Sequence, residues 1–199
     1  MRELDIVRET RRKTLTLVEG LSQKQLDGRP SADKWSIGEV LDHLVLADGI
    51  ARRDFAELIE LARTGREPFL VRRFSDFNPS LLFFPKPLLP FVELPLTVFN
   101  LFMPHAVRDF LVRNRVLPAQ HADATTPRRG RLGEDLRNEL DQSLAATVSL
   151  FAAHSDLDFS CMRHLHPIQG LNDVPGLLRF IANHEGRHQQ QIREALWTA

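Results

Sequence analysis

Two histidines near the end of the chain have the spacing that most clearly indicates chemistry. His184 and His188 lie in IANHEGRHQQQI (181–192). On a helix, residues four apart share one face about 5–6 Å from each other, which suits two ligands of one metal ion. At ~100° per residue both imidazoles fall within an apolar stripe. That stripe consists of Leu177, Leu178, Ile181, Ile192, Ala195 and Leu196. Because buried polar groups are costly without partners, we favour a metal over two hydrogen-bonded core histidines.

The residues around this pair limit the kind of metal site. HEGRH matches H-E-x-x-H, in which the glutamate of a zinc protease is the general base. A catalytic zinc needs three protein ligands, and Glu194 is the only acidic residue after His188 and lies too close to it. This argues against a zinc protease. Glu185, at the other edge of the stripe, is a candidate for proton transfer or a partner for an arginine in the core. Gln191, one turn beyond His188, is a candidate to orient a ligand or water.

A third ligand must therefore come from an upstream segment. His43, in KWSIGEVLDHLVLAD (34–48), is the best candidate. It falls at the flank of the apolar stripe of its segment, which suits a side chain that reaches a neighbouring helix. Cys161, His164 and His166 form a second cluster, in a loop. Their spacing fits no zinc pattern well, so they are a weak alternative, although His166 could line the mouth of the main site.

Four segments show the periodicity of amphipathic helices, and these must position the histidines. They span residues 2–20, 37–64, 134–153 and 172–197. Gly20 closes the first, Ser36 and Glu39 form a capping box before the second, and Pro175 lies in the first turn of the fourth. Strand signals are nearly absent. We therefore predict an all-α protein, an antiparallel four-helix bundle in a single domain of residues 1–199.

A long insertion, residues 66–130, separates the second and third predicted helices. Residues 68–127 hold nine of the twelve prolines and nine of the thirteen phenylalanines. Five prolines interrupt the very apolar stretch 81–104, so it is not a transmembrane helix and we expect no stable membrane insertion. We expect short helices and loops that cover the bundle or form an oligomer contact, with a homodimer as one outcome. A lid over an apolar ligand cavity, or a surface that touches a membrane, is the alternative.

Composition limits the function classes further. Of the 199 residues, 43% are hydrophobic and 26% are charged, as in a soluble globular protein. Lys+Arg and Asp+Glu are both 26, and this zero net charge gives no support for nucleic-acid binding. Two short basic runs, residues 11–13 and 128–129, are expected to be solvated. One cysteine allows no intrachain disulfide, and the charged start lacks a signal peptide's apolar region, so we expect a cytoplasmic protein.

Two motifs together resemble the DinB/YfiT superfamily. They are WSIGEVLDHL (35–44) and, far downstream, His184-x3-His188-x2-Gln191-Ile192; HPIQGL (166–171) is also similar to the family's loop before its last helix. The resemblance implies a four-helix bundle of DinB/YfiT type that holds a divalent metal with three histidines. One comes from the second helix and two from the fourth, here His43, His184 and His188. The resemblance covers residues 1–65 and 130–197 and leaves out the Pro/Phe-rich middle.

Three neutral imidazoles would leave zinc, nickel or iron its +2 charge and open coordination positions. Such a metal lowers the pKa of a bound water or thiol towards neutrality. The resemblance favours a thiol-dependent S-transferase that joins a low-molecular-weight thiol to a small-molecule substrate. A metal-dependent hydrolase that uses metal-bound hydroxide is one alternative. A non-catalytic, metal-containing binding protein for an apolar ligand is another, and a purely structural metal is a third.

Overall fold

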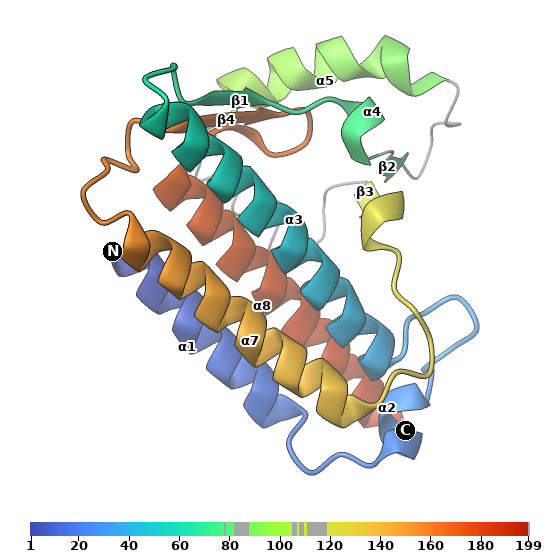
Figure 1. Cartoon of the computed structure of the whole chain (residues 1–199). Helices are drawn as coiled ribbons and strands as arrows, with labels where there is room; N and C mark the ends of the chain where they lie inside the picture. The colour runs from blue at the N-terminus through green and yellow to red at the C-terminus, as the bar shows by residue number, and fades with distance from the viewer. Residues whose placement is uncertain (78, 82–87, 105–106, 108–109, 111–118, 199) are drawn as a thin grey trace.

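Four long helices form a bundle in the computed structural model, which describes residues 1–77, 79–81, 88–104, 107, 110 and 119–198 (Figure 1). The helices are α1 (Arg2–Leu17), α3 (Ile37–Arg63), α7 (Gly133–Ala153) and α8 (Val174–Thr198). A short helix, α2 (Gln23–Asp27), lies between α1 and α3. The predicted helical bundle and the insertion between its second and third helices are confirmed. The bounds differ from the predicted ones by at most three residues.

Local sequence fixes where α3 begins, and so where His43 lies. Ser36 is the N-cap: its hydroxyl accepts from the Glu39 N–H, and the Glu39 carboxylate accepts from the Ser36 N–H. This reciprocal pair satisfies two donors that the first turn leaves unpaired. Glu39 is itself buried and binds the guanidinium groups of Arg29 and Arg129. The capping box thus starts the helix at Ile37, nearly two turns before His43.

The helices do not alternate in direction around the bundle. Three side-chain contacts join α3 to α7 and its flanking residues, and the residue numbers increase in the same direction on both sides. They are Asp42 with Arg131, Arg52 with Ser143, and Arg63 with Asp156. These two helices are therefore parallel, because the insertion returns the chain to the end at which α3 began. Glu3 meets Arg179 and Thr10 meets Gln189, so α1 and α8 are parallel too. The expected antiparallel arrangement holds between α1 and α7 and between α3 and α8 (Figure 1).

Two small sheets are the main departure from the all-helical expectation. β1 (Phe69–Val71) pairs in parallel with β4 (Arg163–His166), which pairs antiparallel with β5 (Gly170–Asp173). A second pair joins β2 (Pro79–Leu81) to β3 (Ala119–Ala122). Each strand has only three or four residues. Such strands are too short to show the two-residue alternation by which sequence reveals a strand.

The insertion also contains helical pieces. These are α4 (Phe74–Phe77), α5 (Leu89–Phe102) and a 3-10 turn, η2 (Asp123–Thr125). In Figure 1, α5 crosses the end of the bundle beside β1 and β4. The Asn100 side chain, at the end of α5, donates to the Pro167 carbonyl at 2.6 Å. Within the described residues, no helix is both long enough and apolar enough to cross a membrane.

A polar layer divides the core into two apolar parts. One part, near the small sheet, is centred on residues such as Phe55, Phe151 and Leu178. The other, near α2, includes Leu41, Leu140 and Ile192. Along α1 and α8, buried polar side chains such as Arg11 and Glu185 stand between the residues of the two clusters, and on α3 the half-buried Asp48 does so. The candidate site lies in this layer.

Candidate metal centre

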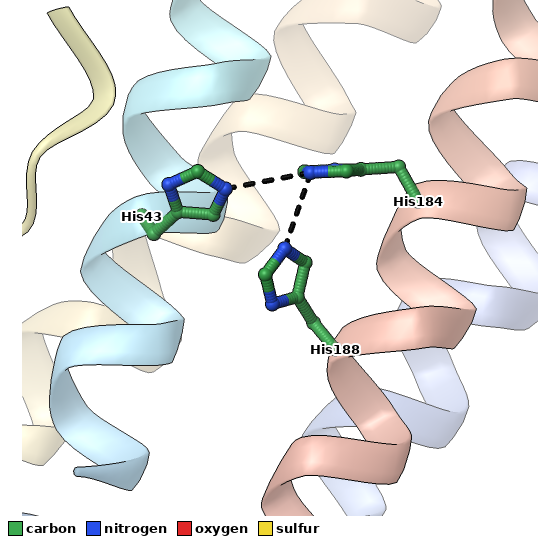
Figure 2. A group of neighbouring side chains, drawn as sticks. All are labelled: His43, His184 and His188. Atoms are coloured by element: carbon green, nitrogen blue, oxygen red, sulfur yellow. Dashed lines mark hydrogen bonds between the residues drawn. The ribbon is translucent and has the colours of Figure 1, made fainter. Parts of the chain in front are cut away.

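Three imidazoles converge between α3 and α8 (Figure 2). The Nε2 atom of His184 lies 3.4 Å from that of His43 and 3.1 Å from that of His188. Ring nitrogens of all three residues lie within 4.8 Å of one another. His43 and His188 are buried, and His184 is half-buried. The structure therefore brings together the three residues that the sequence predicted as ligands, although 141 positions separate His43 from His184.

The spacing of these nitrogens fits coordination to a single ion. Two nitrogen ligands about 2.0–2.1 Å from a tetrahedral metal lie about 3.3–3.4 Å apart. Two of the three separations, 3.1 and 3.4 Å, bracket that value, and the third pair lies within 4.8 Å.

Hydrogen bonds indicate which nitrogen carries a hydrogen in two of the three rings. His43 Nδ1 lies 2.8 Å from the Thr125 carbonyl oxygen, which can only accept, so Nδ1 donates. His188 Nδ1 lies 2.5 Å from Gln191 Oε1 and donates in the same way. A neutral ring that donates through Nδ1 has a lone pair on Nε2. Two lone pairs thus point at Nε2 of His184, which can donate at most one hydrogen. A cation bound between the three rings fits this donor set.

Burial keeps two of the three candidate ligands in the form that binds metals. Loss of hydration lowers the pKa of His184 well below 6.5, and the nearby His43 adds to the effect. Loss of hydration lowers the pKa of His188 in the same direction, with His184 and His43 as further causes. Both rings are therefore neutral at pH 7, and no proton has to leave before a metal binds.

Aromatic rings surround the imidazoles. The Trp35 ring lies 5.0 Å from the His43 ring and 6.4 Å from the His188 ring, nearly parallel to the latter at 12°. Phe180 stacks on His184 with centroids 6.2 Å apart and an interplanar angle of 10°. Sequence analysis did not single out Phe180. Its position four residues before His184 on the same helix face is the signal that could have found it.

A buried carboxylate beside His43 holds the loop that contacts that histidine. Asp42 is fully buried and accepts from the Arg128 N–H at 2.7 Å and from the guanidinium groups of Arg128 and Arg131. These bonds tie residues 123–131, including the Thr125 carbonyl, to the first turns of α3. The basic run 128–129 is largely exposed, as expected, and it also provides counter-charges for α3.

A sequence profile of the DinB superfamily matches residues 6–192. The chain belongs to the DinB superfamily. The match runs through the 66–130 insertion, which the resemblance drawn from the motifs left out. It includes all three clustered histidines of this DinB protein and the residues that orient them.

Two relatives add to this assignment. The uncharacterized protein YuaE of Bacillus subtilis (strain 168) is 27% identical over 192 residues, covering 96% of this chain and 95% of that protein. YfiT from Bacillus subtilis is similar in structure, with a TM-score of 0.57 and 14% identity over 98% of this chain and 83% of that chain. Its structure is described as a probable metal-dependent hydrolase with an unusual four-helix bundle topology. At this identity the likeness shows a shared fold.

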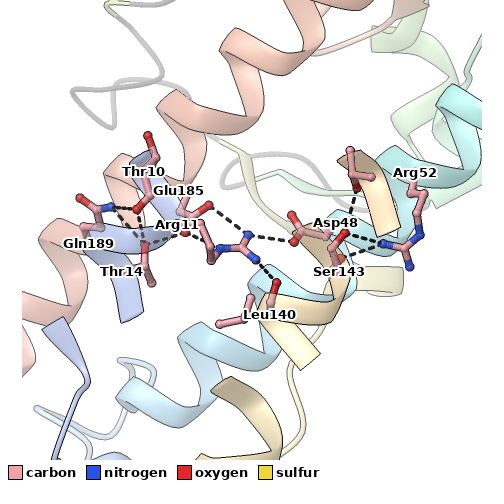
Figure 3. A network of polar contacts seen from close by, with 10 residues as sticks. Thr10, Arg11, Thr14, Asp48, Arg52, Leu140, Ser143, Glu185 and Gln189 are labelled. Atoms are coloured by element: carbon pink, nitrogen blue, oxygen red, sulfur yellow. Dashed lines mark hydrogen bonds and ion pairs between the residues drawn. The ribbon is translucent and has the colours of Figure 1, made fainter. Parts of the chain in front are cut away.

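The two residues predicted for catalysis in this DinB protein have different surroundings. Gln191 lies at the site, where its side chain orients His188. Glu185 is buried, and its carboxylate accepts from Arg11 at 2.8 and 3.0 Å and from Thr14 at 2.6 Å (Figure 3). Its side-chain partners in the described part of the chain all lie on α1. Of the two roles that sequence analysis left open for Glu185, the structure shows the contact with a core arginine.

The weaker cluster of the DinB chain does not form a site. Cys161 is exposed and its thiol contacts Asp158 at 3.0 Å. His164 is buried and binds Asp54 at 3.1 Å, and His166 accepts two backbone N–H groups through Nδ1. Each of the three therefore has different partners. Among the described residues, His43, His184 and His188 are the one group arranged to hold a metal.

Proposed function

We propose that this DinB-superfamily protein is a metal-dependent enzyme acting on small molecules, with one divalent cation held by His43, His184 and His188. Zinc, nickel and iron all suit three imidazoles. The observation that supports the proposal best is the pair of Nε2 lone pairs directed at a third ring nitrogen 3.1 and 3.4 Å away.

The chain's own residues would prepare such a site without taking part in bond making. When bound, a divalent cation would lower the pKa of a water or thiol at its remaining positions. The Thr125 carbonyl and Gln191 hold the His43 and His188 rings in the ligand tautomer. Trp35 and Phe180 place apolar surface beside the rings, which favours a substrate with an apolar or aromatic part.

The reaction we propose first is thiol-dependent S-transfer, with the thiol supplied as a low-molecular-weight co-substrate. The chain's only cysteine contacts Asp158 and is not among the clustered residues. The candidate ligand atoms that lie within 4.8 Å of one another are all imidazole nitrogens. Among the described residues, no carboxylate belongs to this group. Amide or ester hydrolysis usually needs a group to protonate the leaving atom, whereas addition of a thiolate to an electrophile needs less proton transfer. This contrast supports transfer.

Hydrolysis is the second candidate, and the description of YfiT as a probable metal-dependent hydrolase favours it. A water in place of the thiol would require the same three ligands. The two reactions therefore differ in their dependence on added thiol. A non-catalytic protein that binds an apolar ligand would contain the metal and show neither reaction.

The first experiment measures metal content by elemental analysis in the wild-type protein, in His43→Ala and in His154→Ala. His154 binds Arg63 on the outside of the bundle and is the matched control. We expect about one metal ion per chain in the wild type and the control, and none in His43→Ala, because three ligands are the minimum for such a site. A wild-type protein without metal after reconstitution would refute the proposal.

The second experiment follows a model electrophile with and without a small thiol, and an activated ester without thiol. Thiol-dependent consumption that His43→Ala loses would support transfer. Ester cleavage that needs no thiol would favour hydrolysis. A metal-loaded protein that is inactive in both assays and that co-purifies with an apolar molecule would favour the binding protein.

A further inference from the structure

Helix α5 presents an apolar face to solvent. Phe91, Leu94, Phe99 and Phe102 are 76%, 71%, 63% and 79% exposed, and Val98 is 46% exposed. Pro95 is exposed between them. These six residues, called the α5 face below, are Phe91, Leu94, Pro95, Val98, Phe99 and Phe102. Single exposed apolar residues are ordinary, but a contiguous set of this kind on one helix marks a binding surface.

The order of residues in the α5 face is self-complementary. Their spacing of i, i+3, i+4, i+7, i+8 and i+11 forms one stripe along the helix. The stripe is symmetric about its midpoint, between residues 96 and 97. If two copies pack antiparallel about a two-fold axis, three kinds of contact result: Phe91 on Phe102, Leu94 on Phe99, and Pro95 on Val98. A two-fold interface requires this property, because the same surface meets itself.

The area of the α5 face suits a protein partner. A phenylalanine side chain buries about 150–250 Å², so the three exposed phenylalanines offer on the order of 400 Å². With Leu94 and Val98 the face reaches on the order of 600 Å², which is near the roughly 800 Å² per partner of a standard interface. Leu88 and Leu101, at 46% and 41% exposure, extend it at its edges.

The charge of α5 favours a second copy of the chain over a lipid surface as the partner of the α5 face. Helices that lie on membranes carry lysine and arginine on the polar side. The only charged residue of α5 is Glu93, which anionic lipids would repel. The other side of the helix packs on this chain, where Asn100 is buried and donates to the Pro167 carbonyl. The exposed stripe is therefore the side of α5 available to a partner.

We propose that the α5 face binds the α5 face of a second copy of this chain, with the two helices antiparallel about a two-fold axis. The interface lies on the insertion and is independent of the proposed metal chemistry.

Two double variants test both the interface and the direction of pairing. In Phe91→Glu/Phe102→Glu, like charges would face each other across the axis at both ends. In Phe91→Lys/Phe102→Glu, lysine of one copy would face glutamate of the other at both ends. Within one chain the two positions are three turns apart and do not interact. Trp197→Glu is the control, since Trp197 is 90% exposed near the end of α8 and lies outside the α5 face.

Light scattering coupled to size-exclusion chromatography measures the mass of each protein. We expect the mass of two chains for the wild type, Trp197→Glu and Phe91→Lys/Phe102→Glu, and of one chain for Phe91→Glu/Phe102→Glu. Unchanged helical content by circular dichroism would show that the variants fold. A monomeric wild type, a dimeric glutamate variant, or a Lys/Glu variant as monomeric as the Glu/Glu variant would each overturn the proposal. A monomeric wild type that binds phosphatidylcholine–phosphatidylglycerol vesicles would assign the face to lipid instead.

Discussion

Arg11→Met is a change from which the structure predicts a large effect on stability. The Arg11 guanidinium comes from α1 and has partners on each of the other three long helices (Figure 3). It binds Asp48 of α3 at 2.8 Å, the Leu140 carbonyl of α7 at 2.7 Å and Glu185 of α8 at 2.8 Å. Arg11 and Glu185 are each 1% exposed. Burial would lower the pKa of Arg11, but Asp48 and Glu185 outweigh it and raise that pKa, so the cation persists.

The size of the effect follows from the charges that remain. Without Arg11, two carboxylates on neighbouring helices lose their common cation inside the protein. Removing one partner of a buried ion pair costs about 3–5 kcal/mol, mainly because the other charge stays buried and uncompensated. Methionine fills part of the space but offers the carboxylates no donor. For a domain of this size, a loss of that kind lowers Tm by roughly 10 °C.

Urea unfolding at pH 7 gives the measurement, with Arg12→Met as the matched control. Arg12 is adjacent on α1 but exposed, and it binds only Glu9 among the described residues. We expect the control to change the free energy of unfolding by less than about 0.5 kcal/mol. If Arg11→Met changed it by as little as Arg12→Met, the reasoning from buried charge would be wrong.

A triple variant separates lost charge compensation from lost packing. Arg11→Met/Asp48→Leu/Glu185→Leu removes all three charges together. Replacing a buried ionic cluster with apolar groups is often neutral or stabilising. We therefore expect the triple variant to be more stable than Arg11→Met alone. A triple variant at least as unstable as the single one would show that the arginine matters for its volume and not for its charge.

Two further predictions concern the histidines. Gln191→Ala leaves His188 Nδ1 without its acceptor and should weaken metal affinity roughly 10–100-fold, whereas Gln191→Glu should retain it, as measured by competition with a chelator. Burial lowers the pKa of His166 from 6.5 to about 3, so the unfolded chain binds more protons between those values and stability falls as pH drops through that window. His166 contributes up to about 1.4 kcal/mol per pH unit to the change of the free energy of unfolding with pH. His166→Asn can still accept the two backbone N–H bonds and should remove this contribution. Urea unfolding at several pH values measures it, and the same pH dependence in both proteins would contradict the prediction.

Two of the three clustered histidines, His184 and His188, could be predicted because their signal is local. Two imidazoles at i and i+4 on an otherwise apolar stripe would be buried polar groups, which need a compensating partner. This pattern can be recognised within a segment of about a dozen residues. His43 was the best upstream candidate from its position at the flank of a stripe, but that signal is weak alone, and the resemblance to the DinB/YfiT superfamily strengthened it. The short strands could not be predicted in the same way. β4, for example, pairs with β1 across about ninety residues, and its four residues carry no period of their own.

Arg11 shows why local patterns failed elsewhere. In sequence it stands in a basic run of three and looks like a solvated residue. Its burial depends on Asp48 and Glu185, which lie 37 and 174 positions away. Glu185 on the core face of its helix did require a counter-charge, so one end of the pair was foreseeable. The arginine that pairs with Glu185 is determined by the parallel packing of α1 and α8. No sequence pattern within α1 specifies this packing.

The polar layer contacts α8 on two sides, and only one of these sides would depend on a bound metal. On one side His184 and His188 face α3, and on the other Glu185 and Gln189 bind α1. The α1 side is fully hydrogen-bonded without any ion, and apolar clusters lie above and below it. A structural metal normally supplies folding energy that nothing else provides. Here the Arg11 network already links α8 to the other three long helices, so a cation bound by the histidines would be available for chemistry.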